Sequence, residues 1–126
     1  MIRKFIESIE DLINSSSIIL SSQIQKHLNP GGNTVYLKGQ VVFIDSSTLD
    51  MAIYITETRD TLYIDKYRFQ YMNSREHFVF RYDNAPHHPE IKTFPDHKHL
   101  SEGIIPSIRP SFKDILNEIS AFILSE

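Results

Sequence analysis

Histidine and proline are concentrated in one polar segment of the sequence, residues 81–99 (RYDNAPHHPEIKTFPDHKH). This segment holds four of the six histidines and three of the six prolines in a chain of 126 residues. An unperturbed imidazole titrates near pH 6.5, so histidines can both accept and donate protons at neutral pH. A polar segment stiffened by proline is typical of a shaped loop that carries chemistry or recognition on a rigid scaffold.

The first hypothesis for this segment is acid–base catalysis on RNA without a metal ion or other cofactor. Attack by the ribose 2′-hydroxyl requires a base for that hydroxyl, an acid for the leaving oxygen, and cations around the phosphorane. The histidines would supply base and acid, two cations would stabilise the phosphate, and a carboxylate would orient an imidazole. The candidate catalytic residues are Arg81, Asp83, His87, His88, His97, Lys98 and His99.

RNA binding would also require phosphate contacts and surfaces on which bases can stack. The candidate phosphate-binding cations are Lys66, Arg68, Arg75 and Lys92, although such residues usually form a solvated face. Four aromatic residues at strand spacing could stack on bases: Tyr63, Tyr67, Phe69 and Tyr71. Aromatic residues with this spacing more often belong to a core or to cross-strand pairs.

Two alternatives to catalysis stay open for the same segment. A metal site would combine one of two adjacent histidines with a later pair and a carboxylate, but the spacing matches no compact zinc signature. Its candidate ligands are His87 or His88, His97, His99, and Asp83, Glu90 or Asp96. In the other alternative the loop is not catalytic and docks a protein or nucleic-acid partner. A single histidine in such a loop often only binds backbone groups.

The spacing of the histidines predicts how their side chains are directed. Successive residues of an extended segment point to opposite sides, so one imidazole of His87 and His88 should face the sheet and the other solvent or a cleft. His97 and His99 are two positions apart and should share one side, with Lys98 on the opposite side.

The strand that precedes the loop predicts where the loop lies. Phe78, Phe80 and Tyr82 share one side of this strand, whereas Arg81 and Asp83 lie on the other. We therefore expect the loop to fold back over the polar side and to bring its histidines toward Arg81.

Composition and length favour one soluble domain over residues 1–126, with enough apolar residues for a core. There is no cysteine, which excludes disulfides and thiolate metal sites and fits a reducing cytoplasm. The N-terminus lacks the apolar core of a signal peptide, and no apolar run approaches the roughly 18 residues of a membrane span. The formal net charge of −3 argues against wholesale wrapping around nucleic acid but allows a local basic site.

Hydrophobic periodicity predicts an α+β fold, with an antiparallel meander of about five strands flanked by two amphipathic helices. The helices are expected at about residues 2–14 and 111–125, the sheet at about 18–83, and the site loop at 81–106. Short turns between the strands require antiparallel pairing. Ser111 and Asp114 predict a capping box at the start of the second helix. Both helices should pack on one face of the sheet.

The run FRYDNAPHHPE and the later FPDHKH, preceded by the aromatic strand YRFQYMN, resemble the TumE family, the toxins of prokaryotic type II toxin–antitoxin systems. The resemblance covers most of the chain in size and element order, and its specific motifs lie in residues 67–99. The family often has a further histidine just before His97, where this sequence has Asp96.

The resemblance implies a cytoplasmic toxin neutralised by a cognate antitoxin, often one with a helix-turn-helix DNA-binding domain. The ribonuclease mechanism does not come from the resemblance; it is inferred from the residues and from analogy with other small toxins. An antiparallel meander also leaves edge strands that need cover, which favours a homodimer or an antitoxin-covered edge.

Overall fold

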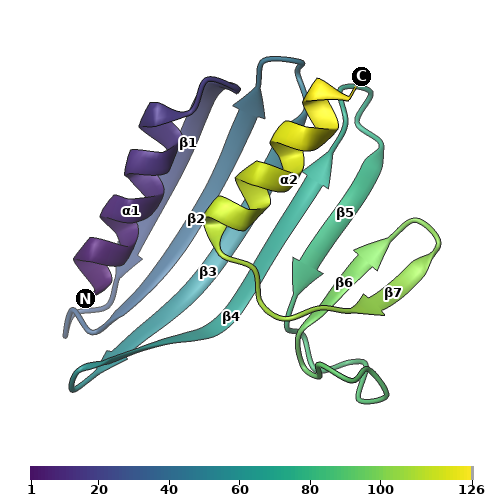
Figure 1. Cartoon of the computed structure of the whole chain (residues 1–126). Coiled ribbons are helices and arrows are strands. Elements are labelled where there is room, and N and C mark those ends of the chain that lie inside the picture. The colour runs from purple at the N-terminus through teal and green to yellow at the C-terminus, as the bar shows by residue number, and fades with distance from the viewer. Residues whose placement is uncertain (126) are drawn as a thin grey trace.

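The computed structural model describes residues 1–125, and Glu126, the last residue of the predicted domain, lies outside the described residues. Seven strands form one antiparallel sheet in the order β1 to β7, and both helices cover the same face of it (Figure 1). The elements are α1 (Ile2–Ser15), β1 (Ile19–Leu28), β2 (Thr34–Phe43), β3 (Thr48–Thr58), β4 (Thr61–Met72), β5 (Phe78–Asp83), β6 (His97–Leu100), β7 (Gly103–Pro106) and α2 (Phe112–Leu124). The predicted α+β class and meander are confirmed, apart from the number of strands.

The prediction of about five strands is wrong, because residues assigned to the loop form a sixth and a seventh strand. β6 pairs with β5, and β7 pairs with β6 through a turn that ends at Gly103, whose φ is 143°. The polar composition of β6 made it resemble a loop, since its histidines face the side of the sheet that no helix covers. The loop is therefore shorter than predicted and covers residues 84–96.

Helix α1 packs on the sheet through a single apolar stripe. Ile2, Ile6, Ile9 and Ile13 are buried at spacings of three and four residues, as the sequence pattern predicts. Burial of each of these side chains stabilises the fold by about 1.5–3 kcal/mol relative to exposure. Among residues 1–125, neither this helix nor α2 is long and apolar enough to cross a membrane.

Helix α2 begins at the predicted capping box. The Asp114 N–H donates to Ser111 Oγ at 3.0 Å, and the Ser111 N–H donates to Asp114 Oδ2 at 3.0 Å. These bonds satisfy donors that a helix start otherwise leaves unpaired, and they lower the pKa of Asp114. Ile115 and Ile119 on the apolar face of α2 are fully buried.

The core lies between the helices and the sheet. Tyr71 contacts Phe43, Phe80 and Phe122 with ring centroids 5.9, 5.4 and 5.6 Å apart, which links β2, β4, β5 and α2. In β2 and β3 the alternate residues are buried: Val35, Leu37, Val41, Phe43, Leu49, Met51, Ile53 and Ile55.

A bulge in the pairing of β3 with β4 reverses which side chains of β4 face the core. The register shifts between Tyr54 and Ile55, so that β4 contains one extra residue at this point. Tyr63 is consequently 51% exposed, whereas Tyr67 and Tyr71 are buried. The buried tyrosines cannot stack on bases.

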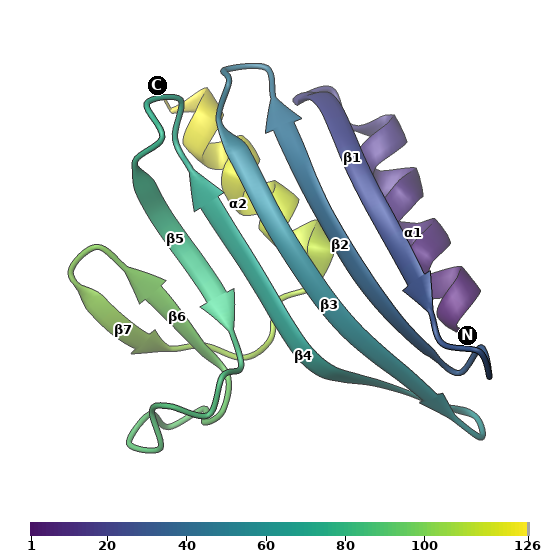
Figure 2. The same cartoon turned by 180° about the vertical axis from the view of Figure 1, so that it is seen from behind.

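The sheet face opposite the helices is here called the open face, and Figure 2 shows it without any helix in front. Because its residues alternate with core residues along each strand, cross-strand pairing identifies them directly. Among them are Tyr36, Lys38, Ala52, Tyr54, Lys66, Arg68, Arg81, Asp83, His97 and His99.

Candidate functional site

The pairing of β5 with β6 brings the predicted site residues together on the open face. Asp83 lies opposite His97, and Arg81 lies opposite His99. Opposed residues share a sheet face, so the predicted common side of the two histidines is confirmed. The loop of residues 84–96 adds a third imidazole from above this face.

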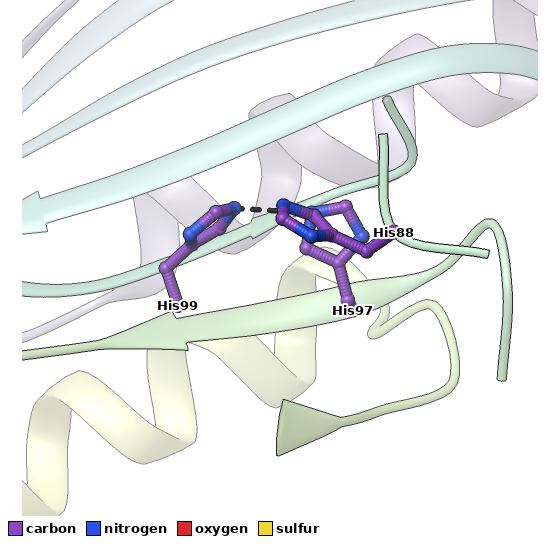
Figure 3. Close-up of side chains that lie close together, drawn as sticks. All are labelled: His88, His97 and His99. Carbon is purple, nitrogen blue, oxygen red and sulfur yellow. Dashed lines mark hydrogen bonds between the residues drawn. The ribbon is translucent and has the colours of Figure 1, made fainter. Parts of the chain in front are cut away.

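That third imidazole belongs to His88, which lies close to the other two (Figure 3). Its ring centroid is 5.2 Å from that of His97 and 6.0 Å from that of His99. The adjacent His87 is exposed, so the structure brings only one of the two neighbouring histidines to the site. We call Asp83, His88, His97 and His99 the histidine cluster.

Asp83 is the carboxylate around which the histidine cluster is arranged. Its Oδ1 lies 3.0 Å from His97 Nε2, and its Oδ2 lies 3.3 Å from His99 Nε2. The Ala85 N–H donates to Oδ1 at 3.0 Å, and Arg81 Nε donates to Oδ2 at 2.9 Å. Asp83 thus has partners from its own strand β5, from the neighbouring strand β6 and from the start of the loop.

Asp83 stays ionised although its side chain is only 4% exposed. Burial alone would raise its pKa, but the Ala85 N–H, the charge of His97 and the Arg81 guanidinium together hold that pKa below the usual value. A buried carboxylate that remains charged at neutral pH can orient and stabilise a protonated imidazole.

Both ring nitrogens of His97 face hydrogen-bond acceptors. Nδ1 lies 2.8 Å from the Pro95 carbonyl oxygen, and Nε2 lies 3.0 Å from Asp83 Oδ1. A neutral imidazole has only one N–H, so it cannot donate to both groups. The arrangement therefore fits an imidazolium, or an imidazole that donates through Nδ1 and binds a cation through Nε2.

The Nε2 atoms of His97 and His99 also contact each other. They are 3.0 Å apart, which requires one nitrogen to donate and the other to accept. Burial lowers the pKa of His99, against the opposing charge of Asp83. His99 therefore tends to be the unprotonated partner at neutral pH.

The two imidazoles at the mouth of the cluster are partly accessible. The side chains of His88 and His99 are 29% and 27% exposed, whereas that of His97 is 2% exposed. His88 Nδ1 lies 3.3 Å from Glu90 Oε1, which fixes the side of the ring that faces away from the cluster. A bound molecule can thus reach His88 and His99 but not His97.

The loop that carries His88 is held by side-chain hydrogen bonds at both ends. Asn84 Oδ1 accepts from the Tyr67 N–H at 3.0 Å, and Asn84 Nδ2 donates to the Asp65 carbonyl oxygen at 3.1 Å. At the other end, Tyr67 Oη donates to Asp96 Oδ1 at 2.8 Å. Burial, with the added effect of Asp96, raises the pKa of Tyr67. These contacts give His88 a defined position.

Lys98, a predicted catalytic residue, is not part of the cluster. Its side chain lies on the helical face, where Nζ is 2.7 Å from Glu118 Oε2 and 4.8 Å from the centre of the Tyr82 ring. The physical reason is the alternation of β6, which separates Lys98 from its histidine neighbours. Sequence reasoning also missed Glu118, although a glutamate within the apolar stripe of α2 signals a buried partner.

The four predicted phosphate-binding cations are separated by the structure. Arg68 pairs with Asp83 across β4 and β5 and lies beside the cluster, and Lys66 lies two residues away on the same face. Arg75 is in the turn before β5, and the strand from Phe78 to Asp83, about 17 Å long, separates that turn from Asp83. Lys92 is exposed on the loop, and no described contact connects it to the cluster.

The cluster also contains the geometry of a metal site. His88, His97 and His99 each present a ring nitrogen, and these nitrogens all lie within 4.8 Å of one another. Of the predicted carboxylate ligands, Asp83 lies against His97 and His99, and Glu90 contacts His88. His87 and Asp96 do not converge, since His87 is exposed and Asp96 binds Tyr67. Imidazole nitrogens suit zinc, copper, iron and nickel ions.

The chain matches the model of a known protein family. A family model described as Toxin TumE matches residues 9–123, which is nearly the whole chain and includes every residue of the histidine cluster. A search of curated proteins and a search of solved structures return no significant match.

Proposed function

The chain belongs to the TumE family of toxins, and we propose that it is toxic because the histidine cluster cleaves RNA without a metal ion. A toxin of this kind belongs to a toxin–antitoxin pair. The observation that carries the proposal is the convergence of three imidazoles at an uncovered sheet face, where two of them contact one buried, ionised carboxylate. Transfer of two protons around a phosphate needs this combination of groups.

The proposed reaction begins when Nδ1 of His99 accepts the proton of a ribose 2′-hydroxyl, while its Nε2 keeps its own proton toward Asp83. The lowered pKa of His99 favours this neutral form at neutral pH. The 2′-oxygen forms a bond to phosphorus, and the bond from phosphorus to the 5′-oxygen breaks. His88 donates a proton to that leaving oxygen. The products are a 2′,3′-cyclic phosphate and a 5′-hydroxyl, so charge and protons balance.

The remaining groups position these two histidines and stabilise charge. Asp83 and His97 hold the cluster together through their 3.0 Å contact. Arg81 binds Asp83 through Nε, which leaves the two terminal amino groups of its guanidinium for a phosphate. Developing negative charge on the phosphorane would thus meet a cation that is already oriented.

Cleavage of RNA by the purified protein in the presence of EDTA tests this proposal. We expect cleavage at pH 7, and we expect His99→Gln to reduce the rate about 100-fold or more. His87→Gln is the matched control, because it changes an exposed histidine of the same region and should alter the rate less than twofold. RNA that stays intact for hours would overturn the proposal.

A metal-dependent variant of the same site is the second candidate, favoured by the three convergent ring nitrogens. In this variant a divalent cation would replace the proton at His97 Nε2. Elemental analysis of protein purified without a histidine tag distinguishes the two. Stoichiometric zinc or nickel, together with activity that EDTA removes and the metal restores, would favour the metal site.

A non-catalytic binding protein is the remaining alternative. It predicts that His88→Ala and His99→Ala weaken binding of the cognate partner, while no preparation ever cleaves RNA. We propose instead that the partner is an antitoxin with a helix-turn-helix domain and that the toxin acts in the cytoplasm, where RNA is its target. A small helix-turn-helix protein encoded beside this gene would support the pairing.

The edge strands support a further proposal, that the toxin alone forms a homodimer. β1 has ten residues, pairs only with β2 among the described strands, and is mostly exposed. An uncovered edge of this length can pair with a second copy. A strictly monomeric mass by light scattering would contradict this.

A further inference from the structure

Three aromatic rings form a continuous row on the open face at some distance from the histidine cluster. His27 of β1, Tyr36 of β2 and Tyr54 of β3 are opposed in the cross-strand register. The rings of His27 and Tyr36 are stacked with centroids 6.1 Å apart, and those of Tyr36 and Tyr54 with centroids 5.4 Å apart. Tyr54 is 44% exposed, an unusual position for a large ring that no helix or loop covers.

A hollow of about 260 Å³ lies at the end of this row. Its lining includes Tyr36 and Tyr54 on one side and Lys66 and Arg68 on the other, with Ala52 between them. Ala52 lies opposite Arg68 in the register, so its small side chain leaves the space that a larger residue would fill. An aromatic wall beside two cations fits a ring that carries a phosphate.

The cations of this region are not neutralised by the protein. Within residues 1–125, Lys38, Lys66 and Arg68 have no ion pair, whereas Arg81 is paired with Asp83. Asp65, the acid nearest to Lys66 in sequence, accepts a hydrogen bond from Thr56. Although the chain has a formal net charge of −3, this part of the open face presents unpaired positive charge next to aromatic rings.

The hollow lies close enough to the histidine cluster for one bound oligonucleotide to contact both. Arg68 is directly opposite Asp83, which is in turn opposite His97. Tyr54 lies two strands from Asp83 and two residues along, roughly 10 Å in one direction and 7 Å in the other. A short oligonucleotide can span this separation.

We propose that the open face binds single-stranded RNA, with a base against Tyr36 and Tyr54 and with phosphates on Lys66 and Arg68. This inference rests on the proposed function and assigns its substrate class. A base can stack on an aromatic side chain only when it is not stacked within a duplex, so the occupant is single-stranded. The cations then direct the next phosphate toward the accessible His88 and His99.

Fluorescence anisotropy with a labelled 2′-O-methyl RNA 12-mer measures this binding without cleavage, because the 2′-hydroxyl is blocked. We expect the full-length protein to bind the single strand at least tenfold more tightly than the same strand annealed to its complement. Tyr36→Ala combined with Tyr54→Ala should weaken binding about tenfold or more. Tyr36→Phe with Tyr54→Phe keeps both rings and should retain affinity within about threefold.

The charge component is tested separately. Lys66→Ala with Arg68→Ala should weaken binding and reduce the dependence of log K on log salt concentration by about one to two units. Lys4→Ala with Lys113→Ala is the matched control, because these exposed lysines lie on the two helices. The control should leave both affinity and salt dependence unchanged.

The outcomes separate this inference from the proposed function. If the alanine variant of Tyr36 and Tyr54 folds and binds RNA as tightly as the unmodified protein, the inference is overturned even when RNA cleavage is observed. If single-stranded RNA binds through these residues but is never cleaved, the binding face stands and the catalytic proposal fails. No binding of single-stranded RNA by the unmodified protein would also overturn the inference.

Discussion

Strand β6 has a polar network on each side, and the two networks differ in how well their donors match their acceptors. On the helical side, Lys98 Nζ contacts Glu118 Oε2 at 2.7 Å and Tyr82 Oη donates to Glu118 Oε1 at 2.6 Å. Each carboxylate oxygen thus has one close donor. Both contacts have a fixed direction, because the ammonium and the hydroxyl donate and the carboxylate accepts, so one arrangement of protons satisfies them.

On the open side, several donors compete for the same acceptors, so no single arrangement of protons satisfies every group. Asp83 contacts two imidazoles, a guanidinium and a backbone N–H, while the Nε2 atoms of His97 and His99 face each other at 3.0 Å. A proton in such a group can move between neighbours with little rearrangement. A network in which every donor has one acceptor is therefore a structural feature, whereas a network with competing donors is a candidate for proton transfer.

The largest expected effect tests the open side. Asp83→Asn keeps the shape of the side chain but removes the charge that orients His97, so RNA cleavage should fall about 1,000-fold. Asp96→Asn is the control, since this carboxylate of the same region accepts only from Tyr67 in the described contacts. Single-turnover cleavage rates check both variants. Equal losses in both would contradict the distinction between the two carboxylates.

A substitution on the helical side should lower the stability of the protein and leave its RNA cleavage rate unchanged. Lys98→Met keeps the apolar stem but removes the ammonium group, so we expect the free energy of unfolding to fall by about 1 kcal/mol, or about 4 °C in Tm. The cleavage rate of the folded variant should stay within twofold. Lys113→Met, an exposed lysine of α2, should change neither quantity. A large loss of cleavage in the Lys98 variant would restore this residue to the catalytic set.

A smaller change on the helical side removes one hydrogen bond. Tyr82→Phe deletes the hydroxyl that donates to Glu118, and it should lower the free energy of unfolding by about 0.5–1 kcal/mol. Chemical denaturation measures this difference. An unchanged midpoint would mean that water replaces the hydroxyl at no cost.

The smallest expected effect is a difference between the two sides of β6 in how their residues make stability depend on pH. The folded-state pKa of His99 lies below its unfolded value near 6.5, so its contribution to stability is complete above that pH and is lost as the pH falls through the folded pKa. Lys98 has a raised pKa, through Glu118 and Tyr82 and against burial, so its contribution is complete from pH 5 to 8.

Thermal unfolding between pH 5 and pH 8 measures this difference. The unmodified protein should lose stability on the acid side, and His99→Gln should lose less of it, whereas Lys98→Met should show the same slope as the unmodified protein. A slope that His99→Gln leaves unchanged would assign the titration to another group.

Sequence patterns predicted much of this arrangement, because β-structure follows a simple period. The faces of Arg81, Asp83, His97 and His99 came from strand alternation alone, and the structure confirms them. The same rule already placed Lys98 on the side opposite His97 and His99, which argues against its predicted catalytic role. The prediction that one of two adjacent histidines faces the site is also confirmed, but the rule could not say that it is His88.

Other features depend on contacts between distant residues and could not be predicted. The carbonyl of Pro95 that fixes His97 is a backbone group, and no side-chain pattern identifies it. The row formed by Tyr36 and Tyr54 is visible only when the register of β2 with β3 is known. The extra strands β6 and β7 were not predicted because each has only four residues, and β6 is polar enough to resemble a loop in composition.

The position of α2 in the sequence has a consequence for how a cell makes this protein. The helix follows the histidine cluster in the chain, and its four buried residues are Phe112, Ile115, Leu116 and Ile119. Burying four such side chains contributes roughly 6–12 kcal/mol, which is comparable to the whole net stability of a typical domain. A chain that lacks residues 112–124 loses this contribution, so we expect its sheet to stay unfolded. The histidine cluster is therefore expected to form only after α2 has been synthesised and has left the ribosome.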